Sequence, residues 1–152
     1  MTTRFERLDE LRDAAGTHLG WTGWIDITQE RVDRFAEATG DHQWIHVDVE
    51  RAIAESPFGG PIAHGYLTLA LSNLFLPELI EVAGASAGVN YGTGKVRFPA
   101  PVPVGSRVRG GAEIVRVEDI PGGLQTTISI TIEIEGKDKP ACVIESLSRW
   151  LA

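Results

Sequence analysis

Three alternating segments in the second half of the chain constrain its fold more than any other feature. β-Branched and polar residues alternate in "GSRVRGGAEIVRVEDI" (105–120), "LQTTISITIEIEG" (124–136) and "PACVIESLSRWLA" (140–152). The breaks "PGG" and "EGKDKP" separate them, and alternation bounded by such turn signals predicts strands. We therefore predict three long antiparallel strands. The upstream stretch 86–105 predicts one or two shorter strands, and its three prolines favour an irregular edge or crossover there.

The first half of the chain predicts helices instead. Residues 63–79, "AHGYLTLALSNLFLPEL", are hydrophobic nearly all round, which a helix tolerates only when other structure wraps it. A short amphipathic helix is predicted over 5–15, with Gly16 as its stop, and a turn follows through 17–23. The pattern therefore favours an α+β fold, in which one long central hydrophobic helix lies on an antiparallel sheet of about five strands. A homodimer could cover the exposed edges of such a sheet.

Two further helices flank a polar stretch in the first half. Thr28 can cap a helix that Gly40 ends, and Asp48 can begin a brief helix through "DVERAIAE". Between them lies "TGDHQWIHVD", which we expect to form a loop. Ahead of Thr28, the piece "WIDIT" alternates apolar and polar residues.

Length and composition limit the classes of function. A chain of 152 residues matches a single domain, 1–152, and no segment is apolar enough for a bilayer span. The charged N-terminus lacks a signal peptide core, so a cytoplasmic protein is expected. The lone Cys142 lies in an apolar stretch and is expected to be a buried structural thiol. A net charge of −7 excludes a general nucleic-acid binder, so an anionic ligand must find a local basic patch.

The stretch "TGDHQWIHVD" carries the ionisable side chains that are best placed for chemistry. Asp41 and His46 can converge on one small molecule as a carboxylate and an imidazole, and these two groups can act in general acid–base catalysis. A structural explanation is also open, because an aspartate is common in the turn after a helix-ending glycine and a lone histidine is usually a hydrogen-bonded polar residue. A metal site is a third interpretation. His42 and His46 stand four residues apart, a spacing that aligns two ligands only on a helix, and Gly40 and the β-branched Ile45 and Val47 make a helix unlikely here. We therefore expect no metal at its candidate ligands, His42, His46, Asp48 and His64.

A second candidate element is "AHGYLT", at the start of the apolar helix. Backbone N–H groups there lack intrahelical partners and suit a developing oxyanion. Gly65 would let a ligand approach this backbone closely, although tight packing of helix on sheet explains a glycine equally well.

Taken together, "GDHQWIH", "FGGPIAHG" and "VRFPAPVPVGSRV" resemble the MaoC-like (R)-specific enoyl-CoA hydratases, a hot-dog-fold family, over nearly the whole chain after about residue 20. The resemblance implies that Asp41 and His46 hold the catalytic water and that the Gly65 amide binds the oxyanion. Asn73 occupies the place of a serine that holds the aspartate in many members, and an asparagine can donate the same hydrogen bond. The family motif G-D-x-N-P-x-H has Asn and Pro where this chain has Gln43 and Trp44.

The implied activity is the addition of water to trans-2-enoyl-CoA to give (R)-3-hydroxyacyl-CoA, or the reverse dehydration. Coenzyme A is part of the substrate, so no cofactor is expected, and neither a nucleic acid nor a membrane is an expected partner. Lys95 and Arg97 share a strand face and could bind the substrate phosphates, as could Arg107 and Arg109. The residues expected to line the substrate slot are Gln43, Trp44, Phe58, Ile62, His64, Tyr66 and Leu67.

Two other functions remain open at this stage. A hot-dog acyl-CoA thioesterase would share the fold, the ligand and an acidic residue near the helix. An acyl-binding subunit of a heteromeric dehydratase would need no chemistry of its own, but such subunits often lack the aspartate and histidine that this chain has.

Overall fold

A six-stranded antiparallel sheet forms the body of the computed structural model, which covers residues 1–152. The three long strands predicted from the second half are confirmed and lie side by side at the centre of this sheet. A fourth, β5, is longer than predicted and forms one edge, and the irregular proline-containing segment follows it. In spatial order the strands are β2 (His18–Trp21), β6 (Arg107–Ile120), β7 (Gly123–Ile134), β8 (Cys142–Leu151) and β5 (Ala87–Arg97), with β3 (Ile25–Asp26) also pairing with β6.

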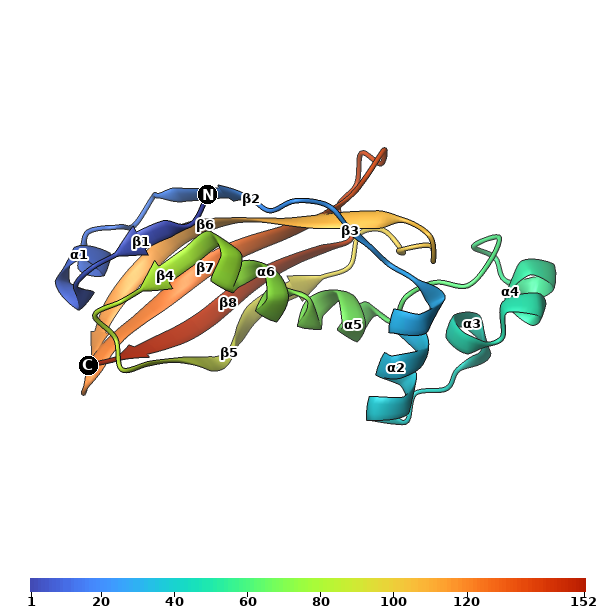
Figure 1. The fold of residues 1–152 in the computed structure, drawn as a ribbon, viewed down its shortest axis with the longest axis horizontal. Helices are drawn as coiled ribbons and strands as arrows, with labels where there is room; N and C mark the ends of the chain where they lie inside the picture. Colours follow the sequence, from blue (N-terminus) through green and yellow to red (C-terminus); the bar gives the residue numbers. More distant parts are fainter.

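The apolar helix lies across one face of the sheet, as predicted, in two pieces (Figure 1). These are α5 (Gly65–Ala70) and α6 (Ser72–Leu79), joined through Leu71, which keeps a helical backbone. Phe75 on α6 is fully buried, and a Cβ atom at Gly110 of β6 would meet its ring at 2.7 Å. Gly110 therefore lets the helix approach the sheet closely. The helix is not wrapped all round, because Tyr66 and Leu74 are exposed.

Three helices gather beyond the start of α5 (Figure 1). Helix α2 (Gln29–Thr39) begins at Thr28, whose hydroxyl accepts the Arg31 N–H at 3.1 Å, and it ends at Gly40 in the left-handed conformation, with φ of 84°. Helix α4 (Val49–Glu55) begins at Asp48, whose carboxylate accepts the Arg51 N–H. Both predicted caps are confirmed.

Other local predictions were confirmed only in part or were wrong. The N-terminal helix α1 covers only Leu8–Arg12, because Thr3–Phe5 forms strand β1 in parallel with β4 (Ile80–Val82), a partner that lies far along the chain. The expected turn through 17–23 contains β2, which pairs with β6. A single helical turn, α3 (Trp44–Val47), forms where we expected only loop.

None of the helices combines the length and apolar character that crossing a bilayer requires. Cys142 is fully buried, and burial raises the pKa of its thiol to about 11, which fits the expected structural role.

Candidate active site

His46 lies on α3 and is held as a neutral imidazole with one free nitrogen. The side chain is buried, and its Nδ1 lies 2.6 Å from the carbonyl oxygen of Ile62. Because a carbonyl only accepts, Nδ1 carries a proton, and in the neutral ring Nε2 then keeps its lone pair. Burial is the main cause that lowers the pKa of His46, opposed by the hydrogen bond to Ile62. The residue therefore has the form that a general base requires.

Asp41 follows Gly40 at the end of α2, and its side chain is exposed. Its carboxylate accepts the Gln43 N–H at 3.2 Å, and its backbone carbonyl accepts a hydrogen bond from His64 Nε2 at 2.9 Å. One side-chain nitrogen or oxygen from each of Asp41, His46 and His64 lies within 4.8 Å of the others. The structure therefore brings together Asp41 and His46, the candidate acid and base that the sequence motif paired.

This cluster differs from the four metal ligands considered from the sequence. His42 is exposed and lies 3.5 Å from Glu37, and Asp48 caps α4. The rings of His46 and His64 stack, with centroids 3.9 Å apart and planes at 26°. Nearly parallel rings direct their in-plane lone pairs side by side, whereas an ion such as Zn²⁺ needs lone pairs that converge on one point. The geometry therefore favours acid/base chemistry over metal binding.

A cavity of about 320 Å³ opens at the start of α5. Gly65 lines it, and as the first residue of α5 its N–H has no intrahelical partner. Neither Asp41 nor His46 lines this cavity, but the His46 ring is bonded to the carbonyl of Ile62, which does line it. The rest of the wall is mostly apolar and comes from segments far apart in the chain: Phe58, Ala63, Thr68, Phe98, Ala100, Pro101, Val102 and Ala141.

Of the seven residues expected in the substrate slot, only Phe58 and Ile62 line this cavity. The five others lie elsewhere for different reasons. Trp44 has the Arg51 guanidinium 4.2 Å from its ring centroid, and Tyr66 is 71% exposed. Leu67 belongs to the core, His64 is buried against His46, and the Gln43 side chain is exposed.

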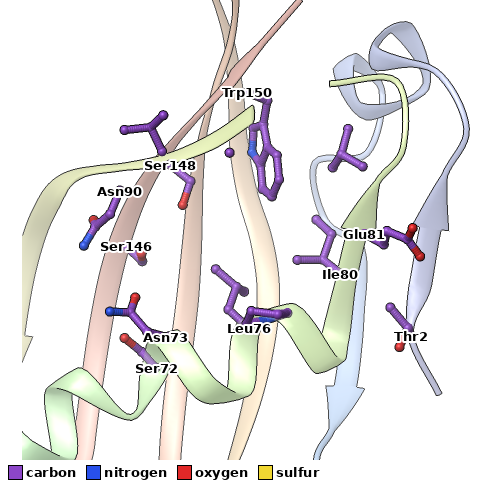
Figure 2. A pocket seen from close by; sticks show the side chains of 14 residues that line it. Thr2, Ser72, Asn73, Leu76, Ile80, Glu81, Asn90, Ser146, Ser148 and Trp150 are labelled. Carbon is purple, nitrogen blue, oxygen red and sulfur yellow. The ribbon is translucent and has the colours of Figure 1, made fainter. Parts of the chain in front are cut away.

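Asn73 does not hold Asp41 within one chain, contrary to expectation. It lies eight residues beyond Gly65, about 12 Å along a helix. There it lines a second cavity of about 470 Å³ with Ser72, Asn90 and Ser146, shown in Figure 2. None of the side-chain hydrogen bonds of Asp41 involves α6.

The two predicted basic pairs differ in their surroundings. Lys95 and Arg97 on β5 are exposed, and neither forms an ion pair. Arg107 pairs with Glu135 at 2.6 Å, and Arg109 pairs with Glu133 at 2.9 Å. Arg109 also stacks against Trp21 and Trp24. Only Lys95 and Arg97 are therefore free to meet a phosphate.

Sequence reasoning missed two supports of the site. Gln29 at the start of α2 donates a hydrogen bond from Nε2 to the His46 carbonyl at 2.7 Å. Phe98 supplies part of the cavity wall and packs 3.5 Å from the position of a Cβ atom on Gly65. A glutamine on a polar helix turn carries no sequence signal for the first contact, whereas the motif "VRFPAPV" marked the segment of the second.

Comparison with known proteins gives a consistent result. A family model described as "MaoC like domain" matches residues 10–135. The chain is 55% identical over 149 residues to 3-hydroxyacyl-thioester dehydratase Z of Mycobacterium tuberculosis, covering 97% of this chain and 98% of that protein. It is 43% identical over 153 residues to nodulation protein N of Rhizobium meliloti, covering 95% of this chain and 89% of that protein.

A solved structure agrees with the fold. The (R)-hydratase from A. caviae involved in PHA biosynthesis superimposes with a TM-score of 0.74 at 21% identity, covering 90% of this chain and 96% of that one. At that identity the likeness concerns the fold alone, and the fold is the hot-dog arrangement predicted from the motifs. The family match and the 55% identical relative carry the assignment further: this chain belongs to the MaoC-like domain family.

Proposed function

We propose that the protein is a hydratase/dehydratase of acyl thioesters, which adds water to trans-2-enoyl-CoA to give (R)-3-hydroxyacyl-CoA and catalyses the reverse reaction. One observation carries the proposal. A buried neutral His46 with a free Nε2 lies beside Asp41, next to a largely apolar cavity that the start of α5 lines. Two relatives are named as dehydratases, one of 3-hydroxyacyl thioesters and one of 3-hydroxybutyryl-CoA.

The reaction assigns one step to each group. The thioester carbonyl accepts a hydrogen bond from the Gly65 N–H, which stabilises the enolate-like charge that grows during attack. His46 Nε2 takes a proton from water while the oxygen adds to C3. A proton passes to C2 through Asp41, and His46 gives back the proton that it took from water, so both carbons of the double bond are saturated and both side chains recover their starting form. Dehydration follows the same steps in reverse.

The cavity and the basic residues suggest how the substrate lies. The cavity walls admit the reacting end of an acyl chain and exclude bulk water. Lys95 and Arg97 are exposed and unpaired, and Arg97 directly precedes Phe98 of the cavity wall. They are therefore suited to bind the phosphates of coenzyme A, although the chain as a whole is acidic.

We propose a homodimer as the working form. The outer edge of β5 has no strand partner, and Tyr66, Leu74 and Val89 are exposed apolar residues on α5, α6 and β5. Antiparallel pairing of two β5 strands would extend the sheet and cover these residues. It would also run the two central helices in opposite directions, bringing α6 of one copy toward the start of α5 in the other. The role predicted for Asn73 would then belong to Asn73 of the second copy.

One assay separates this function from its two rivals. Purified protein is mixed with crotonyl-CoA, and absorbance of the enoyl group and release of free thiol are both followed. Loss of enoyl absorbance without thiol supports hydration, whereas thiol release would identify a thioesterase. No change in either signal would instead favour a binding subunit that depends on a partner.

A further inference from the structure

His64 contacts both the proposed acid, Asp41, and the proposed base, His46. It lines neither of the two cavities described above. Its side chain is 2% exposed. The ring stacks on His46 and also packs against Phe35, with centroids 4.9 Å apart. Its backbone is equally fixed, because the His64 carbonyl accepts the N–H groups of Leu67 and Thr68 in the first turn of α5. Both ring and backbone are therefore held in one position.

Hydrogen bonds to backbone carbonyls fix the proton on each of the two stacked rings. His64 Nε2 lies 2.9 Å from the Asp41 carbonyl oxygen, so this nitrogen must carry a proton. The other nitrogen, Nδ1, is buried and has no partner. His46 has the opposite arrangement, with its proton on Nδ1 toward Ile62. The pair therefore leaves the His46 Nε2 free for chemistry.

We infer that His64 is a positioning residue that sets the separation of the acid and the base: its Nε2–H anchors the Asp41 backbone while its ring face fixes the plane of the His46 imidazole. The inference rests on the proposed function, because that function gives Asp41 and His46 their roles. Proton transfers depend on sub-ångström placement, so one side chain that ties both residues would act on turnover.

Two substitutions remove the two contacts separately. His64→Phe keeps a ring against His46 and Phe35 but cannot donate to Asp41. His64→Gln keeps a donor of similar reach but removes the ring. Each variant is expected to lower kcat for crotonyl-CoA about tenfold to a hundredfold, with KM changed by less than about threefold because no lining residue is altered. The matched control is His42→Gln, on an exposed histidine of the loop that carries Asp41, and it should keep the wild-type kcat.

A pH profile distinguishes positioning from a general loss of stability. Burial lowers the pKa of His46, and removing the ring that covers it admits water. The acid limb of kcat/KM should therefore move to higher pH in His64→Gln, whereas it should move less in His64→Phe, which still covers His46. Thermal unfolding of each variant identifies the folded fraction used to correct kcat.

Wild-type kcat and an unmoved acid limb in both variants would overturn the inference. A loss of kcat that disappears once the folded fraction is taken into account, with an unmoved limb in His64→Gln, would also overturn it, since a defect in folding alone gives that result. Should the wild type hydrate no enoyl thioester, the proposed function fails, and ¹⁵N NMR of the imidazoles still decides the inference. A proton on His64 Nε2, donated to the Asp41 carbonyl, is expected, and a ring with its proton on Nδ1 instead would contradict the inference.

Discussion

At the scale of single residues, the site depends on hydrogen bonds between two short backbone segments. Ile62 donates its N–H to the Ile45 carbonyl at 3.0 Å and accepts from the His46 ring. His64 reaches back to the Asp41 carbonyl. Three bonds thus tie the loop that carries the acid and base to the strand-like segment before α5. They fix side chains relative to the Gly65 amide, which a loop alone would not do.

Replacing either reacting group tests its role. Asp41→Asn removes the proton donor, and His46→Gln removes the base, while each keeps a side chain of similar size. We expect each to lower kcat for crotonyl-CoA hydration by at least about a hundredfold, the usual contribution of one positioned acid or base. Steady-state kinetics on protein with an unchanged circular dichroism spectrum provides the measurement. Near-normal hydration by folded Asp41→Asn would contradict the assignment.

The pH dependence follows from the state of His46. Hydration needs this residue neutral, and burial lowers its pKa below the ordinary 6.5. Activity should therefore persist as pH falls through 6.5 and decline only nearer the lowered pKa. A profile of kcat/KM between neutral and acidic pH measures this limb. A midpoint above 6.5 would mean that another group, or a charged His46, governs the reaction.

The phosphate-binding role of β5 has its own test. Reversing both charges, Lys95→Glu with Arg97→Glu, should raise KM for crotonyl-CoA by about tenfold or more while changing kcat little, because charge-assisted contacts bind substrate and transition state alike. The comparison variant is Arg107→Glu, whose arginine already pairs with Glu135. Equal KM values for wild type and the double variant would remove the proposed patch.

At the scale of elements, the central helix packs so closely on β6 that no side-chain carbon fits between them at Gly110. Phe75 fills the space above Gly110, and Trp21 covers Gly111 on the same strand in the same way, 2.5 Å from the position of a Cβ atom. Neither glycine has positive φ, so both are required by close approach and not by backbone conformation. The position of α5 at the cavity depends on this contact further along the same helix.

Adding one methyl group at this contact should be costly. Gly110→Ala is expected to lower the free energy of unfolding by about 1–3 kcal/mol, because the new Cβ would lie 2.7 Å from a buried ring that cannot move away. Gly23→Ala is the control, since nothing lies within 4 Å of its Cβ position. Urea denaturation of both variants measures the difference. Equal stability of both would show that the helix shifts freely on the sheet.

At the scale of the whole molecule, one side combines an unpaired strand edge with exposed apolar side chains. The sheet ends at β5 with a free edge, and the exposed faces of α5 and α6 next to it carry Tyr66 and Leu74. Large apolar side chains and an unpaired strand on the same side fit a self-complementary interface. The polar cavity that holds Asn73 opens between α6 and β5, on this same side.

A charge placed on this side should weaken the proposed dimer. Leu74→Glu is expected to raise the dissociation constant of the dimer by at least about tenfold, because a carboxylate would have to enter a desolvated interface. Val115→Glu, on an exposed position of β6 away from the free edge, should leave it unchanged. Light scattering during gel filtration measures the mass of each variant. A monomeric wild type would disprove the dimer itself.

The sequence by itself determined the three long strands, the apolar helix, the caps at Thr28 and Asp48, and the pairing of Asp41 with His46. Each of these depends on local periodicity or on residues a few positions apart, and the motifs added the family. The roles of Gly65 and of the two reacting residues remain predictions that the geometry supports.

Only the tertiary structure decided the rest. β1 and β2 form because distant strands satisfy their backbone groups, and the cavity wall is assembled from segments some eighty residues apart, so neither follows from local pattern. His64, expected to touch substrate, is instead buried against His46, and Trp44 lies against Arg51. Which face of a side chain meets a ligand depends on long-range packing, and that packing is what brings the side chains of Asp41, His46 and His64 together.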